Sequence, residues 1–151
     1  MPEPVQIANA PWPSHRERLL DIRFRVFVQE QGVPPGIEED EHDPGALHLL
    51  ALNSSGEMIG CARLVVHDDC GLIGRMAVLP EHRQQGTGTR LLLALVEQAR
   101  KKQLQRLQLH AQCSARDFYA RQGFTAVGPV FNEAGIAHQK MVLELNGRPG
   151  A

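Results

Sequence analysis

The feature that most constrains this chain is a short glycine-containing loop between an apolar strand and a long helix. The segment reads Met76-Ala77-Val78-Leu79-Pro80-Glu81-His82-Arg83-Gln84-Gln85-Gly86-Thr87-Gly88-Thr89-Arg90-Leu91. Unpaired N–H groups at a helix start point outward, and glycines let the backbone approach a phosphate closely. Arg83 adds a mobile cation to the loop. The pattern therefore predicts an anion cradle over residues 83–88.

Two familiar kinds of phosphate loop do not fit this segment. A Walker loop continues with Gly-Lys-Ser/Thr after its glycines, whereas Gly88 is followed by Thr89-Arg90. A dinucleotide-binding fingerprint needs a small residue three positions after its second glycine, where this chain has Leu91. The loop therefore belongs to neither class.

The hydrophobic pattern of the chain predicts an α+β fold. Apolar runs predict strands at residues 5–8, 47–52, 58–66, 72–78, 107–111, 125–131 and 137–145. Helical spacing predicts helices at residues 88–102 and 115–122. This order predicts a mixed, mostly antiparallel central sheet flanked by helices. We expect one domain over residues 1–151, with frayed ends at 1–4 and 146–151.

A further helix is expected near the start of the chain. Pro11-Trp12-Pro13 breaks the opening strand, and Ser14 with Glu17 matches a capping box. The helix is expected to end near Gln31-Gly32, because a proline- and glycine-rich loop follows.

The composition limits the partners that the chain can have. The 151 residues are 42% hydrophobic, carry a net charge of −1, and contain no apolar run of the ~18 residues that a membrane span needs. A near-neutral chain has no general field to attract a phosphate polymer. We therefore expect no nucleic-acid partner and no membrane partner. The first four residues do not resemble a secretory signal, so the protein is expected to be cytoplasmic.

The cysteines and histidines predict no metal site. Cys61, Cys70 and Cys113 form no close pair, which argues against both a disulfide framework and a cysteine-rich zinc site. We expect free, mostly buried thiols. Metal-ligand spacing is absent among the scattered histidines His15, His42, His48, His67 and His82.

The glycine loop and two other parts of the chain resemble one known family. The pattern Arg/Gln-x-x-Gly-x-Gly/Ala, after a strand and before a long helix, resembles the pyrophosphate-binding motif of the GNAT superfamily of N-acetyltransferases. Asp117-Phe118-Tyr119-Ala120-Arg121-Gln122-Gly123-Phe124 is similar to that family's Phe-Tyr-x-x-x-Gly-Phe segment. Three further segments resemble a bacterial branch of the family, the ElaA/YjcF-like group. They are Arg23-Phe24-Arg25-Val26-Phe27-Val28-Gln29-Glu30-Gln31, Ala111-Gln112 and Gly135-Ile136-Ala137-His138. The order of elements matches the GNAT fold over nearly the whole chain.

The resemblance implies that the cofactor is acetyl-CoA (coenzyme A). Its pyrophosphate is expected to bind the backbone of Arg83, Gln84, Gln85, Gly86, Thr87, Gly88 and Thr89. Ser114 and Phe118 are the further expected cofactor contacts. The preceding strand, at Met76, Ala77 and Val78, is expected to offer backbone groups to the pantetheine arm and the thioester carbonyl. An N–H aimed at that carbonyl oxygen stabilises the tetrahedral intermediate.

The resemblance also proposes catalytic residues. Tyr119, the only tyrosine, matches the position of a phenol that protonates the departing sulfur in many relatives. Many relatives carry a carboxylate as base on the central strand just before the residue equivalent to Arg75, and this chain has Gly74 there. Water-mediated deprotonation or a base from elsewhere in the chain is then expected. His110 and His138 are candidate bases, although each can instead be a structural histidine.

The acceptor side is predicted from the charge pattern. The acidic stretch that contains Glu38, Glu39 and Asp40 either attracts a cationic amine at the cleft mouth or is a solvated loop. The preceding helix borders the acceptor side in GNAT folds, so Arg25 is a candidate wall residue, and Phe27 is either wall or core.

The function implied is direct acetyl transfer, in a ternary complex, to the primary amine of a small-molecule or peptide acceptor, expected to be cationic. Two alternatives stay open. One is a non-catalytic acyl-CoA-binding sensor or regulatory module, which Gly74 favours and Tyr119 opposes. The other is an acyltransferase with a hydroxyl acceptor or a longer acyl chain. The sequence also leaves open whether the chain forms a homodimer.

Overall fold

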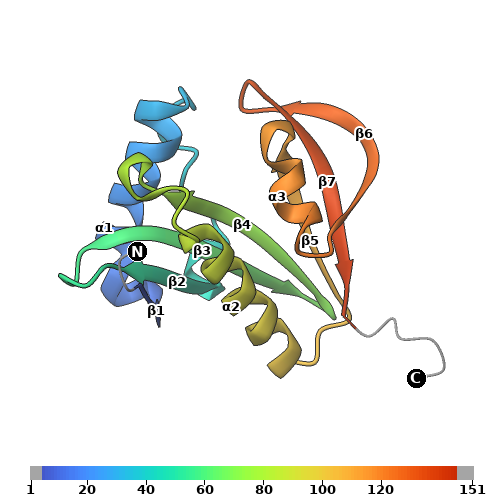
Figure 1. The fold of residues 1–151 in the computed structure, drawn as a ribbon, viewed down its shortest axis with the longest axis horizontal. Helices are drawn as coiled ribbons and strands as arrows, with labels where there is room; N and C mark the ends of the chain where they lie inside the picture. The colour runs from blue at the N-terminus through green and yellow to red at the C-terminus, as the bar shows by residue number, and fades with distance from the viewer. Residues whose placement is uncertain (1–4, 146–151) are drawn as a thin grey trace.

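The computed structural model describes residues 5–145, and the ends that we expected to fray, 1–4 and 146–151, lie outside this range. Within it the chain forms one seven-stranded sheet in the order β1-β2-β3-β4-β5-β7-β6 (Figure 1). The strands are β1 (Gln6–Asn9), β2 (Leu47–Leu52), β3 (Met58–His67), β4 (Cys70–Val78), β5 (Arg106–Gln112), β6 (Thr125–Glu133) and β7 (Ile136–Glu144). All neighbours are antiparallel except β4 and β5. The expected mixed, mostly antiparallel sheet is confirmed.

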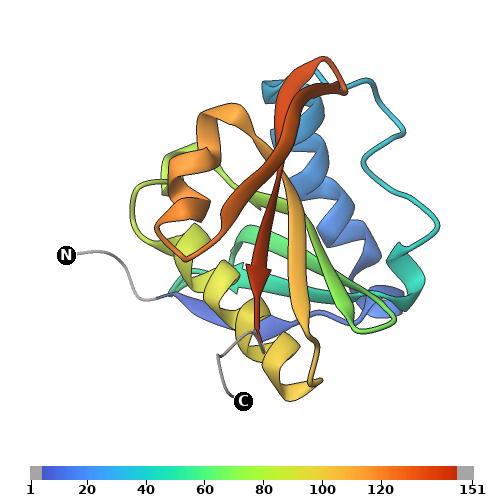
Figure 2. The ribbon, with the colours of Figure 1, turned by 90° about the vertical axis from the view of Figure 1, so that its right-hand side faces the viewer.

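Helices cover both faces of this sheet. The longer ones are α1 (Trp12–Arg23), which continues as a π-helix, η1 (Phe24–Glu30), and α2 (Thr87–Lys101), with a short α3 (Arg116–Ala120). In Figure 2, α2 and α3 lie on one side of the sheet and α1 lies on the other. Short 3-10 turns complete the chain at η2 (Asp43–Gly45), η3 (Pro80–His82) and η4 (Cys113–Ala115).

Because side chains alternate along each strand, the sheet buries one layer of apolar side chains against α2 and another against α1. Leu49 and Ala51 of β2 join the cluster that contains Leu91, Leu92 and Leu95 of α2. The intervening Leu50 packs in the cluster of α1. Because successive side chains of a strand point to opposite faces, a short apolar run such as β2 fills both layers.

The sheet opens between its two parallel strands. The pairing of β4 with β5 covers only Cys70–Ile73 against Arg106–Leu109, and the later residues of β4 have no partner on β5. Figure 1 shows the two halves of the sheet diverging from this shared end. The remainder of β4 therefore presents a free backbone edge inside the molecule.

The start of α1 differs from the sequence prediction. The helix begins at Trp12 with Pro11 as its N-cap and no side-chain cap, so the expected capping box at Ser14 and Glu17 does not form. Ser14 Oγ donates to the Pro11 carbonyl instead, at 3.3 Å. Proline is tolerated in the first helical turn because its missing N–H would have no partner there. The Pro-Trp-Pro segment therefore starts the helix, where we expected it to precede the start.

Other boundaries move by a few residues. The first helical segment ends at Glu30, as expected, but its last turns are wound as a π-helix. The second predicted helix is confirmed with its start one residue earlier, whereas α3 is shorter than the expected 115–122. The three cysteines are free, as predicted, but only Cys61 is buried.

Candidate active site

The glycine loop forms a cradle of free backbone donors at the start of α2. Gln84 and Gly86 both have left-handed backbone angles, with φ of 62° and 83°, and Gly86 is the N-cap. Throughout residues 5–145 the backbone N–H groups from Gln84 to Thr89 have no hydrogen-bond partner. Alternating left-handed residues ahead of a helix start form an anion-binding concavity, which the helix dipole reinforces. The donor set therefore fits a phosphate group.

Two further observations support this fit. The Thr87 hydroxyl is buried, and its oxygen has no hydrogen-bond partner in the described part of the chain. A Cβ at Gly88 would lie 3.5 Å from Phe118 Cζ, so α3 packs directly against the first turn of α2. A buried hydroxyl without a partner is uncommon, because leaving it unpaired costs roughly 1–3 kcal/mol. Ser114, on η4, is exposed.

Arg83 is held more firmly than a free cation would be. Its Nε donates to the Val78 carbonyl at 2.8 Å, and its two terminal nitrogens each donate to the Glu30 carboxylate at 2.6 Å. Those hydrogen bonds lower the pKa of Glu30 and raise the pKa of Arg83. The first residue of the cradle is thereby tied to the end of η1.

The free edge of β4 leads away from the cradle. Leu79 N–H donates to Ile59 on the β3 side, so Val78 directs its backbone groups the other way, where its carbonyl accepts Arg83 Nε. A register shift between Cys61 and Arg63 marks a bulge in this part of the ladder, and Arg75 there has a φ of 52°. Bulges re-aim side chains beside functional sites. Met76 and Val78, the predicted thioester-binding residues, therefore lie on the unpaired edge.

A cleft of about 620 Å³ opens where β4 and β5 separate. Its walls come from η1 and the loop after it, from β3, β4 and β5, from η4 and α3, and from β6, β7 and the turn between them. The residues predicted for catalysis, Tyr119, His110 and His138, line this one cleft together with Met76 of the predicted thioester-binding strand. The structure thus gathers side chains from four separate elements.

Tyr119 reaches the cleft from α3. Its hydroxyl donates to Met76 Sδ at 3.7 Å, and its ring packs edge-on against Phe118 and Phe124. Burial raises the pKa of Tyr119 to about 12. The phenol is therefore neutral at ordinary pH and directs its proton toward the strand that is expected to hold the thioester.

Gly74 also lines the cleft, at the position where many relatives carry a carboxylate. A Cβ placed there would meet only Arg63 Nη2, at 3.8 Å, so the position is open space. Deprotonation of an acceptor would therefore use water or a base from another element.

The two candidate histidines meet at a glutamate. His110 Nδ1 lies 2.9 Å from Glu133 Oε1, and His138 Nε2 lies 3.8 Å from Glu133 Oε2. The Phe131 ring contacts both, edge-on to His110 and stacked on His138. Glu133 was not predicted from the sequence, because it stands beside a turn. The only signal for it was its place on the same strand face as Phe131, two residues away.

The residues that the sequence predicts for the acceptor side lie in different surroundings. Glu38 lines the cleft, and its carboxylate accepts only the Gly36 N–H among the described residues. Glu39 pairs with Arg16. Asp40 lies between two guanidinium groups, 2.7 Å from Arg63 and 3.0 Å from Arg75. Arg25 pairs with Asp21 on the exposed side of the helix, whereas Phe27 lines the cleft.

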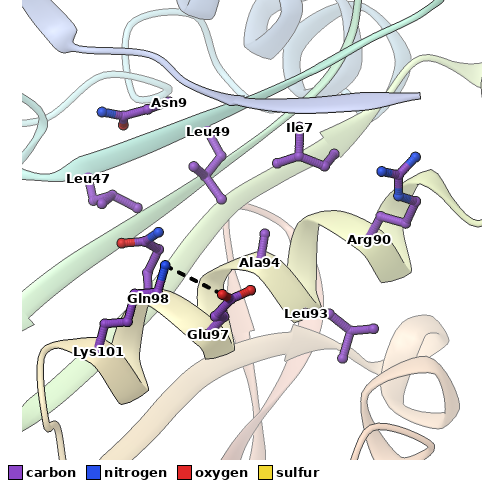
Figure 3. Close-up of a pocket in the computed structure, with 10 residues that line it drawn as sticks. All are labelled: Ile7, Asn9, Leu47, Leu49, Arg90, Leu93, Ala94, Glu97, Gln98 and Lys101. Atoms are coloured by element: carbon purple, nitrogen blue, oxygen red, sulfur yellow. Dashed lines mark ion pairs between the residues drawn. The ribbon is translucent and has the colours of Figure 1, made fainter. Parts of the chain in front are cut away.

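A second hollow, of about 540 Å³, lies between α2 and strands β1 and β2. Figure 3 shows Ile7, Leu49 and Ala94 around its floor, and the ion pair between Glu97 and Lys101 at its side. None of the predicted catalytic or cofactor-binding residues lines it.

Among residues 5–145, no helix is long and apolar enough to cross a membrane. The same residues contain no group of three or more His, Cys, Asp or Glu side chains arranged to hold a metal ion.

Comparison with known proteins gives a consistent result. Residues 14–145 match the family described as the acetyltransferase (GNAT) domain. The uncharacterized N-acetyltransferase YjcF of Bacillus subtilis is 32% identical over 134 residues, which are 86% of this chain and 95% of YjcF. The crystal structure of Escherichia coli ElaA is 27% identical, with a TM-score of 0.83 over 93% of this chain and all of ElaA. PaiA N-acetyltransferase from Thermoplasma acidophilum, solved in complex with coenzyme A, shares the fold at 15% identity, with a TM-score of 0.72 over 94% and 99% of the two chains.

Proposed function

Because the chain belongs to the GNAT family of acetyltransferases, in its ElaA/YjcF-like branch, we propose that it transfers the acetyl group of acetyl-CoA to a primary amine. One observation supports this most strongly: a cradle of free N–H donors at α2 continues into the unpaired edge of β4, which ends in a cleft with proton-handling side chains. Acetyl-CoA supplies a thioester that an amine can attack.

The proposed cofactor contacts use the backbone N–H groups that have no hydrogen-bond partner in the described part of the chain. The backbone from Arg83 to Thr89 binds the pyrophosphate, and Phe118 supports the loop from α3. The free edge from Met76 to Val78 binds the pantetheine arm in the way that an added strand would. An N–H from this edge stabilises the negative charge that develops on the thioester oxygen. Ser114, exposed on η4 just before α3, stays an expected cofactor contact.

Tyr119 acts on the departing sulfur by hydrogen bonding. A phenol with a pKa of about 12 would protonate a thiolate of ordinary pKa only against a free-energy difference of about 5 kcal/mol. A hydrogen bond from the same phenol stabilises the thiolate without that cost. Tyr119 is therefore a hydrogen-bond donor to the leaving group, and the final proton comes from solvent.

The acceptor binds in the cleft on the other side of the thioester. Glu38 and Glu133 line the cleft. Its two arginines, Arg63 and Arg75, share the carboxylates of Asp40 and Asp43 with Arg23, so this cluster holds three positive and two negative charges. With Glu38 and Glu133 added and histidines counted as neutral, the net charge around the cleft is −1, which favours a cationic acceptor. His110 and His138 are the groups in the cleft that can take the proton from the attacking amine.

The test is isothermal titration with acetyl-CoA, followed by free-thiol release with a panel of mono- and polyamines, amino acids and peptides. We expect micromolar binding and amine-dependent thiol release, with faster release for cationic acceptors. Binding without release for any amine would favour an acyl-CoA sensor. Absence of acetyl-CoA binding would contradict the proposed function.

Replacing Tyr119 by phenylalanine should lower kcat by about tenfold or more while the Kd for acetyl-CoA stays within about twofold, because the lost hydrogen bond exists chiefly as sulfur departs. The packing of the ring against Phe118 and Phe124 is retained. Steady-state kinetics and titration on the same preparation provide the comparison. An unchanged kcat would remove Tyr119 from the mechanism.

A further inference from the structure

The turn between β6 and β7 carries a carboxylate that joins two imidazoles inside the cleft. Ala134 and Gly135 have φ of 54° and 82°, the pattern of a tight type I′ hairpin turn, and Gly135 N–H donates to Asn132 Oδ1 at 3.1 Å. Glu133 is the last residue of β6 before this turn. Its carboxylate is therefore placed by a short, well-defined hairpin end, and both of its oxygens face histidines.

Hydrogen-bond chemistry fixes the tautomers of both rings. His138 Nδ1 lies 2.7 Å from the Ile136 carbonyl, and a carbonyl can only accept, so Nδ1 carries the proton. His110 Nδ1 lies 2.9 Å from a carboxylate oxygen, which also only accepts. In the neutral form each ring therefore keeps its lone pair on Nε2. His138 directs that nitrogen toward Glu133 Oε2, across 3.8 Å.

The two histidines differ in exposure. The side chain of His138 is 8% exposed, whereas His110 and Glu133 are 47% and 48% exposed. A separation of 3.8 Å is too long for a hydrogen bond but within reach of an ion pair once Nε2 is protonated. Positive charge on the buried ring is thereby stabilised by a carboxylate that His110 holds from the other side.

We propose that Glu133 is a positioning residue for acetyl transfer: anchored by His110, it stabilises the imidazolium that forms when His138 Nε2 takes the proton of the attacking amine. This rests on the proposed acetyltransferase function. The neutral amine attacks the thioester carbon with its lone pair, its N–H proton passes to Nε2, and the carbon–sulfur bond breaks. The sulfur leaves as a thiolate and is protonated, while His138 returns its proton to solvent.

The other charged and titratable groups that line the cleft come from different elements. Glu38 and His42 belong to the loop after η1, Arg63 and Arg75 to β3 and β4, and Tyr119 to α3. The two arginines are bonded to carboxylates. Among all the charged groups that line the cleft in the described part of the chain, only Glu133 has a carboxylate oxygen within 4 Å of a His138 ring nitrogen.

The first test needs neither an acceptor nor activity. Imidazole ring signals of the full-length protein are followed by NMR against pH, in the wild type and in Glu133→Gln. We expect the titrations of His110 and His138 both to move to lower pH in the variant, because the imidazolium loses its carboxylate. The ring nitrogen shifts should report Nδ1–H in neutral His138. Unmoved titrations, or an Nε2–H tautomer in His138, would overturn the proposal. A matched variant, Glu97→Gln on α2, removes an exposed carboxylate that pairs with Lys101 and should leave both titrations in place.

The second test uses whichever amine gives thiol release. Glu133→Gln should lower kcat about tenfold and move the acidic limb of the pH–rate profile to lower pH, with the Kd for acetyl-CoA unchanged. His138→Gln should lower kcat by about a hundredfold, the lower end of what general base catalysis supplies. Glu133→Asp keeps the charge and should recover part of the rate. A Glu133→Gln enzyme with wild-type kcat and pH profile would show that the carboxylate is only structural. If no amine is acetylated at all, the proposed function fails, while the NMR result still stands or falls alone.

Discussion

Replacing Asp43 by asparagine should lower the free energy of unfolding by about 3–5 kcal/mol, the range for removing one partner of a buried ion pair. The Asp43 side chain is fully buried, and its carboxylate is 3.0 Å from both Arg23 and Arg63. Arg23 is itself buried, so asparagine would leave its guanidinium without a compensating charge. Urea unfolding of the two proteins under one set of conditions measures the difference.

The surroundings of Asp43 explain why the effect is large. Its carboxylate also accepts the Asp40 N–H at 3.0 Å, and its carbonyl lies 2.8 Å from His48 Nε2. The cluster ties α1 and β3 to the loop that forms one wall of the cleft. A matched control is Glu144→Gln, which removes an exposed partner of Arg106 and should cost less than about 1 kcal/mol. Equal losses in the two variants would contradict the argument from burial.

The pKa of Asp43 also predicts how the stability of the fold depends on pH. Burial would raise the pKa of Asp43, but the hydrogen bonds from Arg23, the Asp40 N–H and Arg63 outweigh it and lower the pKa from 3.8 to about 2. Because the folded pKa lies below the unfolded one, the contribution is complete above about pH 4. It is lost as the pH falls through about 2, and amounts to roughly 2 kcal/mol. Asp43→Asn should therefore lose much of this acid sensitivity.

Replacing Gly86 by aspartate should weaken acetyl-CoA binding by at least about a hundredfold, or ~2.7 kcal/mol. Gly86 has a φ of 83°, where a side chain is strained by roughly 1–2 kcal/mol, and no atom within 4 Å would clash with a Cβ. The larger part of the loss comes from the new carboxylate, which would repel a pyrophosphate a few ångströms away. Isothermal titration measures binding, and circular dichroism checks that the fold is intact.

Two variants separate the charge from the strain. Gly86→Ala introduces the same backbone strain without the charge and should cost only a few-fold in affinity. Gly56→Asp places an aspartate at a similar φ of 80°, also with no atom within 4 Å, in the turn between β2 and β3. That protein should bind acetyl-CoA as the wild type does. If Gly86→Asp binds as tightly as Gly56→Asp, the cradle does not hold the pyrophosphate.

Much of the fold follows from local sequence signals. The leucines of α2 recur at helical spacing, and Leu91, Leu92 and Leu95 are all fully buried. The residues of β2, Leu47–Leu52, were predicted with the bounds that the structure gives. Both signals depend on periodicity, which the chain carries in short windows. The start of α1 was predicted wrongly because proline breaks most patterns but is tolerated in a first helical turn.

The candidate site shows the same difference between local and long-range signals. The cradle lies within a few consecutive residues, so its glycines and its helix start could be predicted together. Arg83 was expected as a free cation, yet it is bonded to Glu30, more than fifty residues away. Glu133 approaches His110 only because β7 lies between β5 and β6, an arrangement that no local pattern encodes.

By itself, then, the sequence determined the α+β class, the long helix with its buried leucines, and the glycine loop, because each depends on residues close together in the chain. Only the tertiary structure decided that β4 separates from β5 beyond Ile73, and that His110, Glu133, His138 and Tyr119 belong to one cleft. It also decided that Asp40 is already neutralised by arginines from two other strands. The physical reason is that pairing and burial join residues across loops, and these long-range contacts set the charge and exposure on which the chemistry depends.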